Sequence, residues 1–195
     1  MRNAEFDKEQ VLRAAMTAFL HKGYAKTSMQ DLKKATGLHP GSIYCAFENK
    51  RGLLLAALEQ YRLDRKAEFE QFFAGSEPTL IKLKAYLDGV VAECLSCDMA
   101  KACLLTKALN EIAEQDEEIQ AIIAGNLSML EQALAEKFEQ AKVERTLASD
   151  KDSDHLARYF LMGVYGLRTF AHTHPKAEVL EQLAEQLYQD VIGSS

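Results

Sequence analysis

Apolar residues recur three or four positions apart along almost the whole chain, and this spacing is the feature that most limits how the chain can fold. Residues spaced in this way lie on one face of an α-helix, whereas a half-buried strand alternates apolar and polar residues. No segment shows that alternation. The clearest helical stripe runs over about six turns and contains Ile119, Ile123, Leu127, Leu130, Leu134, Phe138 and Ala141. The pattern predicts an all-α protein of about nine helices.

Three helices are predicted at the N-terminus. The first runs from about Lys8 to Lys22 and ends at a glycine. Ser28 opens a second, short helix, and Asp31 lies three positions later, as in a capping box. Gly37 supplies the backbone freedom for a tight turn, and Pro40 begins a third short helix. Two short helices joined by a turn with glycine are the minimum pattern of a helix-turn-helix.

The rest of the chain is predicted to continue as helices. Asn49 is a plausible cap for a long fourth helix that reaches about Phe73, and Gly75-Ser76-Glu77-Pro78 is the clearest break. Further helices are predicted over about residues 80–94, 104–112, 119–141, 151–173 and 176–192.

Charge is distributed unevenly. Residues 1–50 carry a formal charge of +3 and the other 145 residues carry −9. A basic head on an acidic body is expected where only one end of a protein meets phosphates. There is no run of ~18 apolar residues and no apolar segment near Met1, so we expect neither a membrane span nor a secretory signal. The expected location is the cytoplasm. Four cysteines in 195 residues are expected to be reduced thiols.

The predicted helix-turn-helix offers the groups that DNA binding requires. The second helix of such a pair enters the major groove and reads bases from its N-terminal residues. Here that N-terminus is His39-Pro40-Gly41-Ser42, and Gly41 and Ser42 are small enough for a close approach. The candidate phosphate donors are Thr27, Ser28, Tyr44 and Lys50. The same pattern also occurs as a plain structural corner, and the periodicity alone does not separate the two.

The stretch from Val11 to Leu58 resembles the N-terminal domain of the TetR family of transcriptional regulators. The matching residues include Lys22-Gly23-Tyr24, Thr27-Ser28-Met29, Gly41-Ser42-Ile43-Tyr44, Phe47 and Asn49-Lys50. The resemblance implies a cytoplasmic homodimer that binds a short palindromic operator and is released when a small molecule enters the C-terminal domain. It also places Gly41, Ser42 and Tyr44 on the recognition helix, and Thr27 and Lys50 at phosphates.

The chain departs from the family pattern at three places. His39 lies where the family often has Ser, Cys45-Ala46 replaces a pair that is usually larger or more polar, and Gly52 lies where a helix-favouring residue is common. The first two departures bear on which bases are read. We expect residues 1–50 to bind double-stranded operator DNA and residues 51–195 to bind the effector and form the dimer.

An apolar pocket between the fifth and eighth helices is the expected effector site. The candidate lining residues are Tyr86, Leu105, Leu109, Met129, Phe138 and Tyr159, each of which also suits an ordinary core position.

Cys94, Cys97 and Cys103 permit three interpretations. The first is small core packing, since free cysteine is often buried and Cys94 lies on an apolar stripe. The second is a thiol sensor at Cys97 or Cys103, near a helix junction, where a helix N-terminus lowers a thiol pKa. The stretch from Lys101 to Leu105 resembles a TetR subgroup in which a cysteine at the position of Cys103 is common and in a few members senses electrophiles. The third is a metal site, for which Cys94-x-x-Cys97 supplies only half a pattern; no metal is expected.

The last two predicted helices have broad apolar faces that suit a symmetric four-helix contact between two copies. The candidate dimer residues are Tyr159, Gly163, Leu167, Phe170, Leu183 and Leu187, with the glycine allowing close helix approach.

Two other classes of function compete with regulation. An enzyme would require a nucleophile elbow, a Gly-rich phosphate loop or a complete metal motif, and the sequence has none of these, so neither an enzyme nor a cofactor is expected. A helical interaction module that has lost DNA binding is the other alternative. Substitution of Tyr44 and Lys50 would separate it from a regulator.

Overall fold

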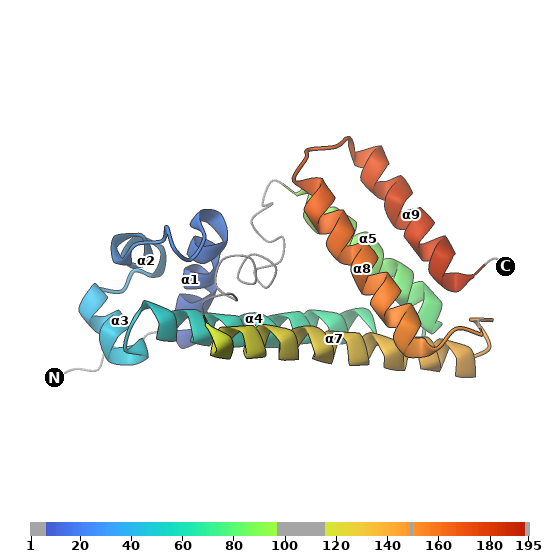
Figure 1. Cartoon of the computed structure of the whole chain (residues 1–195), viewed down its shortest axis with the longest axis horizontal. Helices are drawn as coiled ribbons and strands as arrows, with labels where there is room; N and C mark the ends of the chain where they lie inside the picture. The colour runs from blue at the N-terminus through green and yellow to red at the C-terminus, as the bar shows by residue number, and fades with distance from the viewer. Residues whose placement is uncertain (1–6, 97–115, 149, 194–195) are drawn as a thin grey trace. The chain divides into compact units, whose positions relative to one another are not determined.

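The computed structural model describes residues 7–96, 116–148 and 150–193, and every regular element in these ranges is an α-helix (Figure 1). The helices are α1 (Lys8–Lys22), α2 (Met29–Thr36), α3 (Pro40–Phe47), α4 (Lys50–Phe72), α5 (Thr79–Leu95), α7 (Glu117–Val143), α8 (Ser153–Ala171) and α9 (Ala177–Ile192). The predicted all-α class is confirmed. The helix predicted over residues 104–112 lies outside the described residues.

The helix ends follow the local signals in the sequence. Asp7 caps α1 by accepting a hydrogen bond from Gln10 N at 3.1 Å, and Gly23 ends the helix with a φ of 80°. Gly37 ends α2 in the left-handed conformation, which glycine adopts without steric cost. The predicted start and stop of the first helix, and the predicted starts of the second and third helices, are therefore confirmed.

The described residues fall into two compact units, of which the first contains residues 7–66 and 116–123. In this unit α2 packs against both α1 and α3. Its buried hydrophobic side chains are Val11, Leu12, Ala15, Phe19, Leu20, Leu32, Ile43, Phe47, Leu53, Leu54, Ala57, Leu58, Tyr61, Ile119 and Ile123. Arg13 adds a polar link, because its guanidinium donates to both carboxylate oxygens of Asp64 on α4.

The second unit contains residues 67–96, 124–148 and 150–193. Here α5, α8 and α9 pack against one another in pairs, and α8 and α9 run antiparallel (Figure 1). Glu144, just beyond α7, accepts from Thr79 N at 2.9 Å and from Thr79 Oγ1 at 2.7 Å. These bonds supply the N-terminal cap that Pro78 cannot provide to α5.

Within the described residues, no helix combines the length and apolar character that crossing a membrane requires.

Candidate nucleic-acid interface

The short α2 and α3 are joined by a turn whose conformation the sequence dictates. Ser28 Oγ accepts from Asp31 N at 3.2 Å, while Ser28 N donates to the Asp31 carboxylate at 2.9 Å. The predicted capping box is therefore confirmed. After Gly37 the chain reaches His39, which precedes Pro40 at the first position of α3, where proline is well tolerated.

Helix α3 has one buried face and one exposed face of small residues. Ile43 and Phe47 are buried and anchor the helix in the first unit. Gly41, Ser42, Tyr44, Cys45 and Ala46 are exposed. Apart from Tyr44, none of the exposed residues has a side chain longer than that of Cys, so the backbone of α3 can approach a partner closely.

His39 caps α3 with its ring. The imidazole Nδ1 accepts a hydrogen bond from Gly41 N at 3.3 Å, and the side chain lies at the surface. This bond satisfies one of the backbone donors that the first turn of a helix leaves without a partner.

The joint between α3 and α4 is tight and explains one departure from the family pattern. Glu48 has a φ of 65° and a ψ of −48°, and Asn49 N donates to Phe47 O at 2.7 Å, which together make a γ-turn with positive φ. Asn49 Oδ1 then accepts from Gly52 N at 2.9 Å and caps α4, as predicted. A Cβ at position 52 would lie 2.1 Å from Phe47 O. Glycine is therefore required there for the turn to close.

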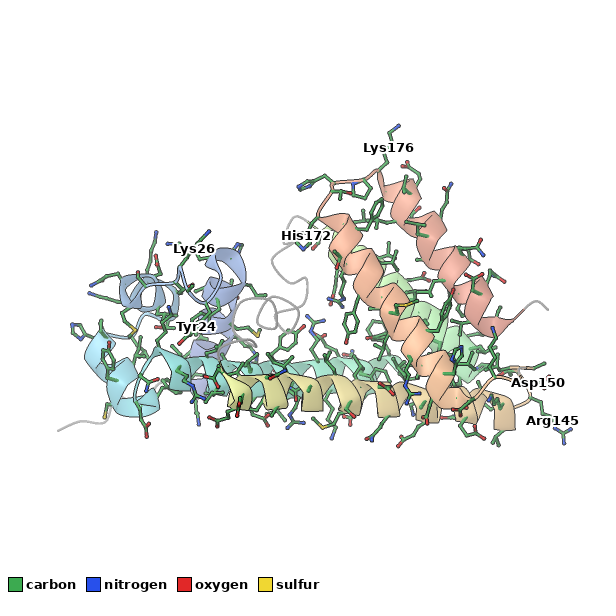
Figure 2. The ribbon with its side chains drawn as sticks, viewed as in Figure 1. Tyr24, Lys26, Arg145, Asp150, His172 and Lys176 are labelled. Atoms are coloured by element: carbon green, nitrogen blue, oxygen red, sulfur yellow. The ribbon has the colours of Figure 1, made fainter. Side chains whose placement is uncertain are left out.

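Lys50 lies beside the segment that joins α1 and α2. Its ammonium is 4.4 Å from the centre of the Tyr24 ring and 3.4 Å from Ala25 O. Figure 2 shows Tyr24 and the neighbouring Lys26 on this segment. The cation–π contact fixes the position of the Lys50 charge without cancelling it.

Thr27 and Ser28 were predicted to offer hydroxyls to phosphate, and the structure places both hydroxyls differently. Thr27 is buried, and its Oγ1 donates to Gly23 O at 2.6 Å. Ser28 is exposed, but its Oγ donates to the Asp31 carboxylate at 2.7 Å. Both hydroxyls therefore donate to acceptors within the chain, at the turn before α2, and neither proton is left to donate to a phosphate.

Three lysines near these helices were missed by the sequence reasoning. Lys26, Lys33 and Lys34 are exposed, one before α2 and two within it. Lys22 is less available, since its ammonium forms an ion pair with Asp31, which holds the pKa of that carboxyl well below its usual range. The clustering of lysines around a short helix was the signal that could have identified them.

Arg51, in the first turn of α4, joins the start of α7. Its guanidinium donates to both carboxylate oxygens of Asp116, one of them at 2.8 Å, and to Glu118 at 2.6 Å. Because of the Arg51 hydrogen bonds, the pKa of Asp116 falls from 3.8 to about 2. Arg51 is thus linked to residues that lie 65 and 67 positions later in the sequence, within the first unit.

The four predicted effector residues that the structure describes are not brought together in one cavity. Tyr86 and Phe138 both pack on Phe160, with ring centres at 6.2 and 5.9 Å, and so belong to an aromatic cluster in the core of the second unit. Met129 is 45% exposed on α7. Tyr159 donates to Asp190 at 3.1 Å in an open groove of about 1030 Å³ between α8 and α9. Leu105, Leu109, Cys97 and Cys103 lie outside the described residues.

Apart from Tyr159, which lies in the groove between α8 and α9, the predicted dimer residues divide into two groups. Leu167 and Leu187 are buried within the chain's own core, and Gly163 is packed against Leu187, since a Cβ there would lie 2.3 Å from Leu187 Cδ2. Phe170 and Leu183 are exposed, as are two further apolar residues, Val179, which belongs to the predicted apolar face of the last helix, and Met162, which was not predicted. The apolar side chains available on α8 and α9 are therefore Met162, Phe170, Val179 and Leu183.

The two cysteines in the described residues differ. Cys94 is buried, and this burial raises the pKa of its thiol, against the opposing influence of Arg168. Cys45 is exposed on α3. The described residues contain no group of three or more His, Cys, Asp or Glu side chains that could hold a metal ion.

Comparisons with known proteins agree with the helix-turn-helix. Residues 11–57 match the model for bacterial regulatory proteins of the tetR family. The chain is 33% identical over 161 residues to an uncharacterized HTH-type transcriptional regulator, YezE, from Bacillus subtilis (strain 168), covering 81% of this chain and 82% of the relative. It is 28% identical over 181 residues to the HTH-type transcriptional repressor ComR from Escherichia coli (strain K12), covering 92% of this chain and 86% of the relative.

Solved structures share the fold over nearly the full length. A cysteine mutant of the TetR family transcriptional regulator CifR, complexed with 26 bp double-strand operator DNA, has a TM-score of 0.84 and 25% identity. The match covers 96% of this chain and 98% of that one.

Proposed function

This chain belongs to the TetR family of bacterial regulatory proteins, and we propose that it is a homodimeric repressor that binds a palindromic operator through α3. The observation that carries the proposal is the exposed face of α3, where Gly41, Ser42, Cys45 and Ala46 allow the backbone to approach the major groove. The CifR structure with operator DNA supports this use of the fold. ComR, named as a repressor, supports the direction of the effect.

Phosphate contacts come from residues around α3. Tyr44 is 49% exposed and offers a hydroxyl, and Lys50 offers a charge positioned by Tyr24. Lys26, Lys33 and Lys34 add positive charge on the same unit. Contacts of this kind give affinity and register, while base contacts give sequence preference.

A second copy of the chain completes the site. Met162 and Phe170 on α8, with Val179 and Leu183 on α9, form an apolar surface that a symmetric partner would cover. Gly166, between the two α8 residues, has open space around its Cα, so a partner helix can approach closely there. Two α3 helices about 34 Å apart would meet successive turns of B-DNA.

Release from the operator follows from a signal that the C-terminal residues sense. We assign DNA binding to residues 1–50, and effector binding and dimerisation to residues 51–195, in a cytoplasmic protein. The signal is a small molecule or modification of a thiol. Burial raises the pKa of the Cys94 thiol and so disfavours its reactive thiolate form. The candidates for thiol modification in residues 51–195 are therefore Cys97 and Cys103. Either signal must stabilise the released state more than the bound one, or it shifts nothing.

Operator binding by Lys50→Ala at several salt concentrations tests the phosphate contacts. If Lys50 of each subunit binds one phosphate, the dimeric variant loses two phosphate contacts and binds all operators more weakly. The slope of its log affinity against log salt then becomes shallower by about 2. Lys176→Ala, which removes an exposed lysine just before α9, is the matched control and should leave the slope unchanged. An unchanged slope for Lys50→Ala would remove Lys50 from the interface.

The competing class, an enzyme, finds no support among the relatives, which are transcriptional regulators. We propose that the chain has no catalytic activity of its own. Turnover of a substrate by a protein that retards no promoter fragment would reverse this assignment.

A further inference from the structure

His39 presents a hydrogen-bond donor in a fixed position. A neutral imidazole has one N–H, so a ring whose Nδ1 accepts from Gly41 N carries its proton on Nε2. The side chain is exposed, and Nε2 lies on the opposite side of the ring from the capped backbone. The cap therefore fixes the tautomer and restricts the ring, which lowers the entropy lost when the donor binds a partner.

The other residues of α3 leave few alternatives for reading bases. Ile43 and Phe47 are buried, while Pro40, Gly41 and Ala46 have no polar side-chain atom. The remaining residues, Ser42, Tyr44 and Cys45, have polar side chains that distinguish bases only weakly. The hydroxyls of Ser42 and Tyr44 both donate and accept, so they discriminate poorly between base edges, and the Cys45 thiol is a weak donor. His39 is thus the one side chain between residues 39 and 47 that presents a nitrogen donor.

We propose that His39 determines operator specificity by donating Nε2–H to N7 of a guanine in each half-site. In the major groove guanine presents two neighbouring acceptors, N7 and O6. Cytosine presents a donor, adenine has a donor beside its N7, and thymine has a single acceptor, O4, beside a methyl group. A single directed N–H therefore finds its most favourable target over guanine. This inference rests on the proposed function, because it requires α3 to enter the groove.

Two substitutions separate the cap from the donor. His39→Ser keeps a preferred N-cap residue but removes the ring and its Nε2–H, while His39→Ala removes both. Thermal unfolding of each variant establishes that it is folded. Each protein is then measured on operators selected from random DNA by the wild-type protein, with 7-deazaguanine placed at one guanine at a time. That base keeps its pairing but lacks the N7 acceptor.

The expected result is an affinity decrease of about fivefold for the wild-type protein at one guanine in each half-site, the size of a single neutral hydrogen bond. His39→Ser should be insensitive to the replacement at that guanine and should accept other bases there. If His39→Ser keeps the wild-type base preference and only His39→Ala binds weakly, His39 is a cap alone and the inference is overturned. Failure of the wild-type protein to select any sequence would instead overturn the proposed function.

Discussion

Single residues at the α3–α4 joint show how little freedom this part of the chain has. Glu48 adopts a positive φ that costs a non-glycine residue energy, and Gly52 allows the Phe47 carbonyl to lie where a Cβ would stand. The family resemblance marked Gly52 as a departure from a helix-favouring position. Its cause is the close approach of Phe47 O.

Gly52→Ala should destabilise the protein by about 1–3 kcal/mol, because the added methyl meets backbone that cannot move without opening the turn. Urea unfolding measures the change. Gly125→Ala is the control, since a Cβ at this helical glycine meets nothing within 4 Å and should stabilise by about 0.5–1 kcal/mol. Equal effects of the two substitutions would show that crowding at position 52 is unimportant.

The Arg51–Asp116 contact gives a prediction of pH dependence. The folded pKa of Asp116, about 2, lies below the usual 3.8, so the ionised carboxylate stabilises the folded state above pH 3.8. This contribution disappears as the pH falls from 3.8 towards 2. Asp116→Asn should therefore lower the free energy of unfolding at pH 7, and the difference from wild type should narrow below pH 4.

Urea unfolding of both proteins at a series of pH values checks this prediction. Asp150→Asn, at an exposed carboxylate just before α8 (Figure 2), is the matched control for removal of one negative charge. A difference between wild type and Asp116→Asn that stays constant from pH 7 to pH 2 would contradict the assigned role of Arg51.

At the scale of elements, local signals in the sequence were sufficient for the helices but not for the direction of side chains. The capping box at Ser28 and the stops at Gly23 and Gly37 depend on residues a few positions apart, and all were predicted correctly. The inward turn of the Thr27 hydroxyl depends on the carbonyl of Gly23 in three dimensions. Periodicity does not contain that information.

The last two helices illustrate the same limit. Their apolar residues were predicted, but an apolar stripe does not reveal which members face the chain's own core. Leu167 and Leu187 are internal, while Met162 and Phe170 are exposed. The packing of α8 against both α5 and α9 decides between these positions, and it becomes visible only in the folded unit.

Met162→Lys tests the proposed dimer surface. Met162 is 63% exposed, so lysine is tolerated in a monomer, but in a symmetric interface two buried charges would face each other. We expect dissociation in sedimentation experiments and operator affinity more than about tenfold weaker, as for a central interface residue. Val143→Lys, at a residue 75% exposed beyond the proposed surface, should remain dimeric. A dimeric Met162→Lys protein would place the interface elsewhere.

At the scale of the whole molecule, the uneven charge agrees with DNA binding by the N-terminal residues alone. The first fifty residues carry +3, and the remaining residues carry −9, within an overall −6. Nonspecific attraction to DNA is thereby confined to the helix-turn-helix region. The negative charge of residues 51–195 disfavours other orientations of the protein on DNA.

Selection of bound duplexes from a random DNA pool by the wild-type protein tests whether α3 enters DNA twice in a symmetric complex. We predict enrichment of a palindrome whose half-sites are centred about one helical turn apart, roughly 10–10.5 base pairs or slightly more. A single asymmetric site, or no enriched sequence at all, would contradict this mode of binding.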